Sequence, residues 1–153
     1  MASTTAVTTE ILNALLSALS DVLPQQIERD RPTLFSGPVI QQEMGVLIGL
    51  TGVLPGRLFL YGGNAVFSGL AEKMYGMKLT GDMLESFVGE LGNMIGGNLC
   101  SHAATADIHL EITPPTVIIG ETKLSGFSTA IRLPVHVQEV GRIDTILALS
   151  DKI

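Results

Sequence analysis

Apolar residues recur every three or four positions in three parts of the chain, which is the spacing of one face of a helix. The first run extends over residues 11–23 and stops at Pro24, which cannot continue a helix. The second covers residues 65–75 and is followed by Gly76, a candidate C-terminal cap. The third covers residues 82–103. The pattern therefore predicts one early helix and a later pair of adjacent helices.

Segments rich in β-branched residues lie between and after these helices, with the alternation that is typical of strands. We read the charged segment 25–32 as a connection. The expected strands are residues 33–42, 45–51, 57–61, 108–112, 117–119, 127–137 and 143–149, and Pro134 indicates a sheet edge or a bulge. The order of helix, strands, two helices and strands predicts an α/β fold of the α+β type. We expect a single domain over residues 1–153, with a mostly antiparallel sheet covered by helices.

The composition adds that the chain is unusually apolar. Of its 153 residues, 46% are hydrophobic and 16% are charged, against about 25% charged residues in an ordinary globular protein. This composition excludes a disordered chain. Gly, Pro, Asn and Ser interrupt the uncharged stretches 44–56 and 58–71, so neither has the roughly 18 continuous apolar residues of a membrane-spanning helix. We expect no membrane segment, and the first Lys or Arg, Arg29, comes too late for a secretory signal.

Charge and cysteine content narrow the possible partners and location. Nine basic residues against fifteen acidic ones leave a net charge of −6, so the chain lacks the basic surface that binding to nucleic acid requires. Its one cysteine, Cys100, cannot form an internal disulfide, which agrees with a reducing compartment, and we expect a cytoplasmic protein. The His and Cys residues lack the spacing of a metal site, and GxGxxG and P-loop motifs are absent, so we expect neither a metal site nor nucleotide binding.

The third predicted helix, residues 82–103, has a polar face as well as an apolar one. Asp82 and Glu85 at its start have the spacing of a capping box. At about 100° per residue, one stripe opposite the apolar face contains four residues: Ser86, Glu90, Asn93 and Gly97. A stripe of this kind is usually only a solvated helix face.

Glycines in and beside this stripe indicate that something lies close to the helix. Each glycine costs a helix about 1 kcal/mol relative to alanine, and four fall in this stretch: Gly89, Gly92, Gly96 and Gly97. Either a second helix packs closely against them, or a partner approaches the side chains of Glu90 and Asn93 without obstruction. The residues alone leave both explanations open.

The motif Ser86-x3-Glu90-x2-Asn93 lies within ESFVGELGNMIGGNL, and ITPPTVIIG with Pro114 and Pro115 follows about twenty residues later. These segments resemble the CheC/CheX/FliY phosphatases of bacterial chemotaxis, and CheX most of all. The likeness extends over nearly the whole chain, through GLTGVLPGRLFLY and STAIRLPVHV. It implies a CheC-like fold, a homodimer, and an enzyme that hydrolyses the aspartyl phosphate of a CheY-like response regulator.

The resemblance also implies a role for each residue of the motif. Glu90 would pair with the active-site lysine of the regulator, and the Asn93 amide would orient the attacking water. Ser86 occupies the less strict first position, and Gly89 and Gly97 would lie against the bound partner. An aspartyl phosphate is already activated, so positioning a water supplies most of the catalysis and no covalent nucleophile is needed. The chain would need no cofactor of its own, because the Mg²⁺ would belong to the regulator.

Other interpretations stay open. The same stripe could dock a response regulator or a flagellar switch component without hydrolysis, or it could be a solvated face of a plain assembly protein. Glu10-x2-Asn13 on the first helix could form a second active pair, but Ala6 stands where Ser or Asp is expected, so we favour an ordinary polar face. In a dimer, a second copy could cover the apolar segments 46–50 and 58–60, which would explain the small number of charges.

Overall fold

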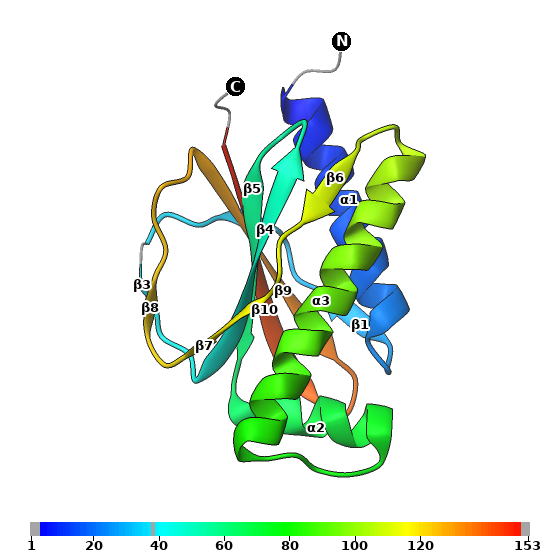
Figure 1. Ribbon diagram of the computed structural model, residues 1–153, viewed down its shortest axis with the longest axis vertical. Helices are drawn as coiled ribbons and strands as arrows, with labels where there is room; N and C mark the ends of the chain where they lie inside the picture. The colour runs from blue at the N-terminus through cyan, green and yellow to red at the C-terminus, as the bar shows by residue number, and fades with distance from the viewer. Residues whose placement is uncertain (1–3, 38, 151–153) are drawn as a thin grey trace.

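An antiparallel sheet with two long helices on one face forms the framework of the protein (Figure 1). The computed structural model describes residues 4–37 and 39–150. In this part of the chain the helices are α1 (Thr4–Val22), α2 (Asn64–Tyr75) and α3 (Gly81–Thr105). The strands are β1 (Ile27–Arg29), β2 (Thr33–Leu34), β3 (Val39–Ile40), β4 (Met44–Gly52), β5 (Gly56–Gly62), β6 (Leu110–Ile112), β7 (Thr116–Ile119), β8 (Thr122–Lys123), β9 (Thr129–Val137) and β10 (Gly141–Leu149). The predicted α+β class and antiparallel sheet are confirmed.

Strands from both halves of the chain form the centre of this sheet. Its order is β1-β9-β10-β5-β4-β6, while β2 also pairs with β9 and β7 with β4. The hairpin β9–β10 is paired from Gly141 opposite Val137 to Leu149 opposite Thr129, and β10 then pairs with β5. A separate ribbon, β3 with β8, lies to the left in Figure 1. Strand β4 pairs with the short strands β6 and β7 and also packs against α3.

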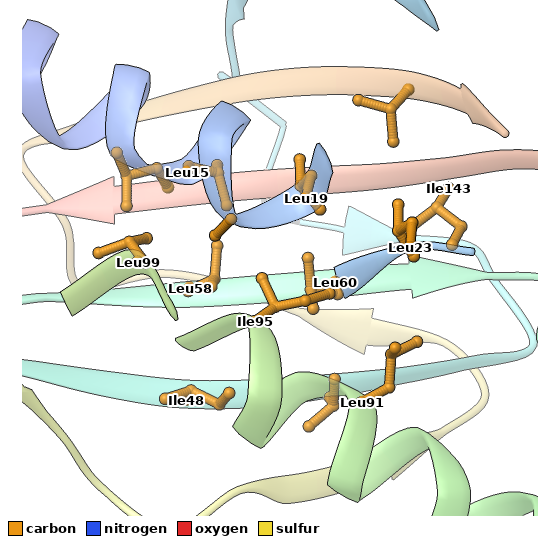
Figure 2. Close-up of a cluster of buried hydrophobic side chains, with 14 of the residues drawn as sticks. Leu15, Leu19, Leu23, Ile48, Leu58, Leu60, Leu91, Ile95, Leu99 and Ile143 are labelled. Atoms are coloured by element: carbon orange, nitrogen blue, oxygen red, sulfur yellow. The ribbon is translucent and has the colours of Figure 1, made fainter. Parts of the chain in front are cut away.

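The main hydrophobic core lies between the sheet and helices α1 and α3, which pack against each other (Figure 2). Figure 2 shows its side chains: Leu15 and Leu19 of α1, with Leu23 just after the end of that helix; Leu91, Ile95 and Leu99 of α3; and Ile48, Leu58, Leu60 and Ile143 of the sheet. A polar contact joins the two helices where His102 Nε2 lies 2.7 Å from Asp21 Oδ2. Because this core fixes the rotation of α3 about its axis, residues on the opposite side of α3 face outward.

The other face of the sheet is covered by the β3–β8 ribbon and its flanking loops. A second apolar cluster there contains Ile40, Phe59, Tyr61, Leu124, Ala130, Ile146 and Ala148. The expectation that a second copy covers segments 46–50 and 58–60 is therefore wrong, because Val46, Ile48, Leu50 and all of residues 58–60 are at most 2% exposed within this one chain. Strands buried on both faces have nearly continuous apolar sequences, which explains the small number of charged residues.

The expected strand 33–42 is wrong in its extent. The structure has two short strands there, and they belong to different sheets: β2 pairs with β9, whereas β3 pairs with β8. Conversely, the segment 25–32, which we read as a connection, contains β1 paired with residues 135–137 of β9. These strands have two or three residues each and are mostly exposed, so they are too short for an alternation pattern to reveal them.

The signals expected at helix ends have different outcomes. Gly76 caps α2 as predicted, with φ 79° and with its N–H donating to a carbonyl of the last turn (2.8 Å). The capping box of Asp82 and Glu85 is wrong, because α3 begins at Gly81 and its N-cap is Thr80, which makes no side-chain cap hydrogen bond. Asp82 therefore lies inside the first turn, where its negative charge interacts favourably with the positive end of the helix dipole.

Pro134 lies within β9, opposite Asp144 of β10. Its carbonyl accepts a hydrogen bond from the N–H of Asp30 (2.9 Å), at the point where the outer neighbour of β9 changes from β1 to β2. The proline, which has no N–H to donate, thus occupies an interruption of the outer ladder. The expected sheet edge is nevertheless wrong, because β1 and β2 both pair with the outer side of β9, and the proline lies at the gap between them.

The sheet also buries one carboxylate. Asp144 is 3% exposed, and it accepts hydrogen bonds from Arg132 Nη2 and Arg142 Nε, each at 2.6 Å. Burial raises the pKa of Asp144, but the hydrogen bonds from Arg142 and Arg132 outweigh this effect and hold the pKa below its ordinary value. Burial, together with the charge of Asp144, raises the pKa of neighbouring Tyr61 to about 12. The fold therefore contains Asp144 in its charged form.

Replacing Asp144 by asparagine is expected to lower the free energy of unfolding at pH 7 by about 3 kcal/mol. This is the lower end of the range for breaking a buried ion pair, because both guanidinium groups are partly exposed. Since the pKa of Asp144 is lowered in the folded chain, its contribution is complete above the unfolded pKa of about 3.9 and is lost as the pH falls through the folded value. Urea unfolding at pH 7 and at several acid pH values should show the two proteins converging in acid. A gap that stays constant with pH would contradict this role.

Candidate functional site

A groove runs between α3 and the connection of β6 to β7. It is open to solvent and has a volume of about 590 Å³. Its helical side is formed by Glu85, Ser86, Gly89, Glu90 and Asn93, and its other side by residues 112–115 and Val117. The structure thus brings together the helical stripe and the proline pair, which lie about twenty residues apart in the sequence.

The helical side of the groove carries most of the polar stripe predicted from the sequence. Ser86, Glu90 and Asn93 are exposed, while Val88 and Leu91 on the other face of α3 are buried. Among the described residues, none forms a hydrogen bond or an ion pair with the side chain of Glu90 or Asn93. Their polar atoms are therefore free to meet another molecule, and no contact within the described part of the chain would have to break.

A β-bulge forms the opposite side of the groove. Strands β6 and β7 pair with the same edge of β4, with Ile112 opposite Leu50 and Thr116 opposite Leu47. Between these pairs, residues 48 and 49 of β4 face the three residues 113–115. One extra residue therefore pushes the chain outward at the proline pair, which is the geometry of a bulge.

Thr113 fixes this bulge to the sheet. Its N–H donates to the Gly49 carbonyl (3.0 Å), and the Gly49 N–H donates to Thr113 Oγ1 (2.8 Å). A Cβ on residue 49 would lie 2.9 Å from the Thr113 side chain, so this close approach requires glycine. Pro114 and Pro115 follow with φ angles restricted by their rings. The groove therefore has one stiff wall.

The sheet beneath α3 explains three of its glycines. A Cβ on Gly92 would lie 2.6 Å from a methyl group of Val46 on β4. Cβ atoms on Gly89 and Gly96 would lie 3.2 Å from a side chain of β7 and 3.3 Å from side chains of β6 and β4, respectively. For these three glycines, the close neighbour within the chain is thus a strand and not a second helix.

Gly97 is different from these three. Apart from the neighbouring helical backbone, no atom of the described chain lies within 4 Å of the position that its Cβ would take. It follows Asn93 by about one helical turn. Of the two glycines expected to contact a partner, Gly97 is therefore open on its outer side, whereas Gly89 lines the groove and faces Val117.

Alanine substitutions at Gly92 and Gly97 are expected to affect stability differently. At both positions, replacing glycine by alanine should stabilise the helix by about 1 kcal/mol, because alanine has the higher helix propensity. At Gly92 the new methyl group meets Val46, which is fully buried and stiff at χ1, and overpacking of this kind costs about 1–3 kcal/mol. The difference in unfolding free energy between the two variants, measured by urea denaturation, should therefore equal this packing cost. Equal stabilities would show that α3 does not lie this close to β4.

The second candidate pair lies away from the groove. Glu10 and Asn13 are exposed on α1, and neither lines the groove beside α3. The structure keeps the two Glu-x2-Asn pairs on separate helices, and of these two it is the pair on α3 that faces the bulge.

Sequence reasoning missed two residues of this region. Thr113 was hidden because its role depends on Gly49, which is 64 residues away in the chain. Met83 lies seven residues before Glu90, so it falls on the same stripe, and its side chain is 61% exposed. Extending the helical wheel toward the start of α3 would have found Met83.

Within residues 4–37 and 39–150, no group of three or more His, Cys, Asp or Glu side chains is placed to hold a metal ion. Over the same residues, no helix combines the length and the apolar character needed to cross a membrane.

Comparisons with known proteins identify the family. The family model described as chemotaxis phosphatase CheX matches residues 44–136, a segment that contains α3 and the bulge. The CheY-P phosphatase CheX of Thermotoga maritima is 30% identical in an alignment 135 residues long, which covers 83% of this chain and 87% of that protein.

Solved structures share the fold. Chemotaxis protein CheX from Desulfovibrio desulfuricans matches with a TM-score of 0.80 and 19% identity, over 95% of this chain and 99% of that one. A chain of the CheX–CheY–BeF3–Mg²⁺ complex from Borrelia burgdorferi matches with a TM-score of 0.75 and 24% identity, over 94% of this chain and 97% of that one. With the motif, the groove and these relatives together, the chain belongs to the CheX family of chemotaxis phosphatases.

Proposed function

We propose that this chain hydrolyses the aspartyl phosphate of a CheY-like response regulator, with Asn93 positioning the attacking water and Glu90 pairing with a lysine of the regulator. One observation carries the proposal. Glu90 and Asn93 stand exposed and without a described partner on one helix face, beside a groove with a stiff wall, in a chain of the CheX family. The relative from Thermotoga maritima is named for activity on CheY-P, and the Borrelia burgdorferi structure contains CheY.

A neutral amide suits the positioning of water. The Asn93 side chain can both donate and accept a hydrogen bond, so it can hold a water with a lone pair directed at phosphorus. As the water oxygen bonds to phosphorus, the bond from phosphorus to the aspartate oxygen breaks, and a carboxylate and inorganic phosphate result. In-line positioning supplies most of the catalysis for so loose a transition state. The Mg²⁺ would be the regulator's own, so this chain needs no cofactor.

Glu90 would hold the docked partner in register. It lies three residues before Asn93, so the Cβ atoms of the two side chains are about 5–6 Å apart. A carboxylate at this position can accept a charge-assisted hydrogen bond from a lysine ammonium group. The net charge of −6 also favours the approach of a partner through a basic site.

The homodimer and the cytoplasmic location stay predictions. A dimer interface would have to lie outside the sheet face that the β3–β8 ribbon covers, because that apolar face is already buried within one chain.

The proposal is tested by adding the wild-type chain to phosphorylated CheY-like regulators from the same organism and following the loss of phosphate. We expect the decay rate of one regulator to rise in proportion to the concentration of the chain. Binding of the same regulators, activated with beryllium fluoride and Mg²⁺, is measured in parallel by calorimetry. Binding without faster decay would contradict the phosphatase and identify a docking module instead.

A further inference from the structure

The exposed stripe of α3 extends beyond the groove to an apolar side chain near the start of the helix. Met83 is 61% exposed and lies seven residues before Glu90, which places it on the same face, about 10 Å away along the helix axis. Ser86 lies between them on that face. In the other direction the stripe continues through Gly97, Ser101 and Ala104, which are all small. The large exposed apolar group is therefore at one end of the stripe only.

A second exposed apolar side chain, that of Tyr75, packs against a helix neighbour of Met83. Tyr75, the last residue of α2, is 58% exposed, and its ring packs edge-on against Phe87 with ring centroids 5.8 Å apart. Phe87 follows Met83 by four residues, so the two are neighbours on the helix surface. Met83 and Tyr75 are therefore two exposed apolar side chains that share Phe87 as a neighbour, and we call them together the α2–α3 patch.

We propose that the α2–α3 patch is the apolar part of the docking surface for the response regulator, so that Met83 and Tyr75 bind the same partner whose phosphate Asn93 and Glu90 reach. The inference rests on the proposed function. A standard protein interface buries about 800 Å² on each side, which is a disc of about 16 Å radius. A disc of this size centred on Glu90 and Asn93 includes Met83, which lies about 10 Å from Glu90 and about 15 Å from Asn93 along the helix axis.

The position of Met83 argues against a second copy of this chain as the occupant. A copy that covered Met83 would also lie against Ser86 and Glu90, because these residues are three and seven positions further on the same helix face. It would close the groove that a phosphorylated regulator must reach. The flexible thioether side chain of methionine is suited to an interface that forms and dissociates repeatedly.

The test compares Met83→Ala with Val53→Ala. Val53 is a matched control because it is 57% exposed and lies in the β4–β5 turn, at the opposite end of the molecule from the connection of α2 to α3 (Figure 1). Calorimetry gives the Kd for a regulator loaded with beryllium fluoride and Mg²⁺, and phosphate release gives kcat and KM. Met83→Ala should raise Kd and KM about fivefold to twentyfold, the effect of losing part of a buried methionine side chain, with kcat within twofold of wild type. Val53→Ala should leave all three unchanged, and Met83→Leu should restore Kd to near the wild-type value.

The other possible results distinguish failure of the docking surface from failure of the phosphatase activity. If Met83→Ala binds the regulator as tightly as wild type does, the patch is not part of the docking surface, whatever the fate of the phosphatase. If Met83→Ala changes self-association in analytical ultracentrifugation and leaves regulator binding intact, the patch belongs to a dimer and the inference is wrong. If wild type binds but does not hydrolyse, and Met83→Ala weakens binding, the phosphatase fails while the docking surface stands. If wild type binds no regulator, both fail.

Discussion

Asn93→Ala is expected to lower the rate of phosphate release by about a hundredfold or more at a saturating concentration of regulator. The amide is the group that would hold the attacking water, and loss of a single positioning or hydrogen-bonding group of this kind costs about 10²–10³ in kcat. The variant should still fold, because Asn93 is exposed and none of the described residues is bonded to its side chain. Stopped-flow or radiolabel assays of the regulator's phosphate give kcat, and thermal unfolding checks the fold.

Asn13→Ala provides the matched control for this prediction. Asn13 is also exposed and also follows a glutamate by three residues on a helix, but it lies away from the groove. We expect the phosphate-release rate of Asn13→Ala to stay near that of wild type. The double variant Glu10→Ala, Asn13→Ala should also keep a rate near that of wild type. A fall to about half would indicate a second working site on α1. A rate for Asn93→Ala within about threefold of wild type would contradict the role of the amide.

The second large effect is expected for Glu90→Gln, which keeps the size of the side chain and removes its charge. A hydrogen bond to a charged group contributes about 1.5–3 kcal/mol, so Kd for the activated regulator should rise about tenfold to a hundredfold. The phosphate-release rate at low regulator concentration should fall by the same factor. The dependence of Kd on salt should also become weaker, because an ion pair is lost. Titration calorimetry at two ionic strengths measures both changes.

Glu85→Gln distinguishes a specific pair from general electrostatics. Glu85 lines the same groove one helical turn or so before Glu90, and its removal changes the net charge by the same amount. We expect an effect on Kd well below that of Glu90→Gln. Equal effects for the two variants would show that the groove attracts the regulator only by its overall charge, and that Glu90 has no lysine partner.

The long helix is the part of the molecule that sequence reasoning predicted best. Its apolar positions repeat regularly between Leu84 and Leu99. A helical-wheel plot therefore places the buried residues on one face of the helix and Glu90 and Asn93 on the opposite face. The two residues could be singled out because the information lies within a few turns of one element. The resemblance to a family supplied the chemistry, which periodicity alone does not contain.

Features that depend on distant parts of the chain could not be predicted in the same way. The glycines indicated a close neighbour of α3, but the neighbour of Gly92 is Val46, on a strand that comes before the helix pair. The bulge at 113–115 depends on Gly49. The pair of arginines that holds Asp144 comes partly from β9 and partly from β10 itself. In each case at least two separate elements supply the contacting groups, and only the folded arrangement of these elements brings the groups together.

Phosphate release with a small amount of this chain shows whether the chain turns over as an enzyme. The wild-type chain is mixed with a tenfold to hundredfold molar excess of phosphorylated regulator, and the inorganic phosphate released above the intrinsic decay is counted per chain. The proposed phosphatase activity predicts many phosphates per chain, with the multiple-turnover rate lost in Asn93→Ala although this variant still binds the activated regulator. Release that stops at one phosphate per chain, or that never exceeds the intrinsic decay, would contradict it.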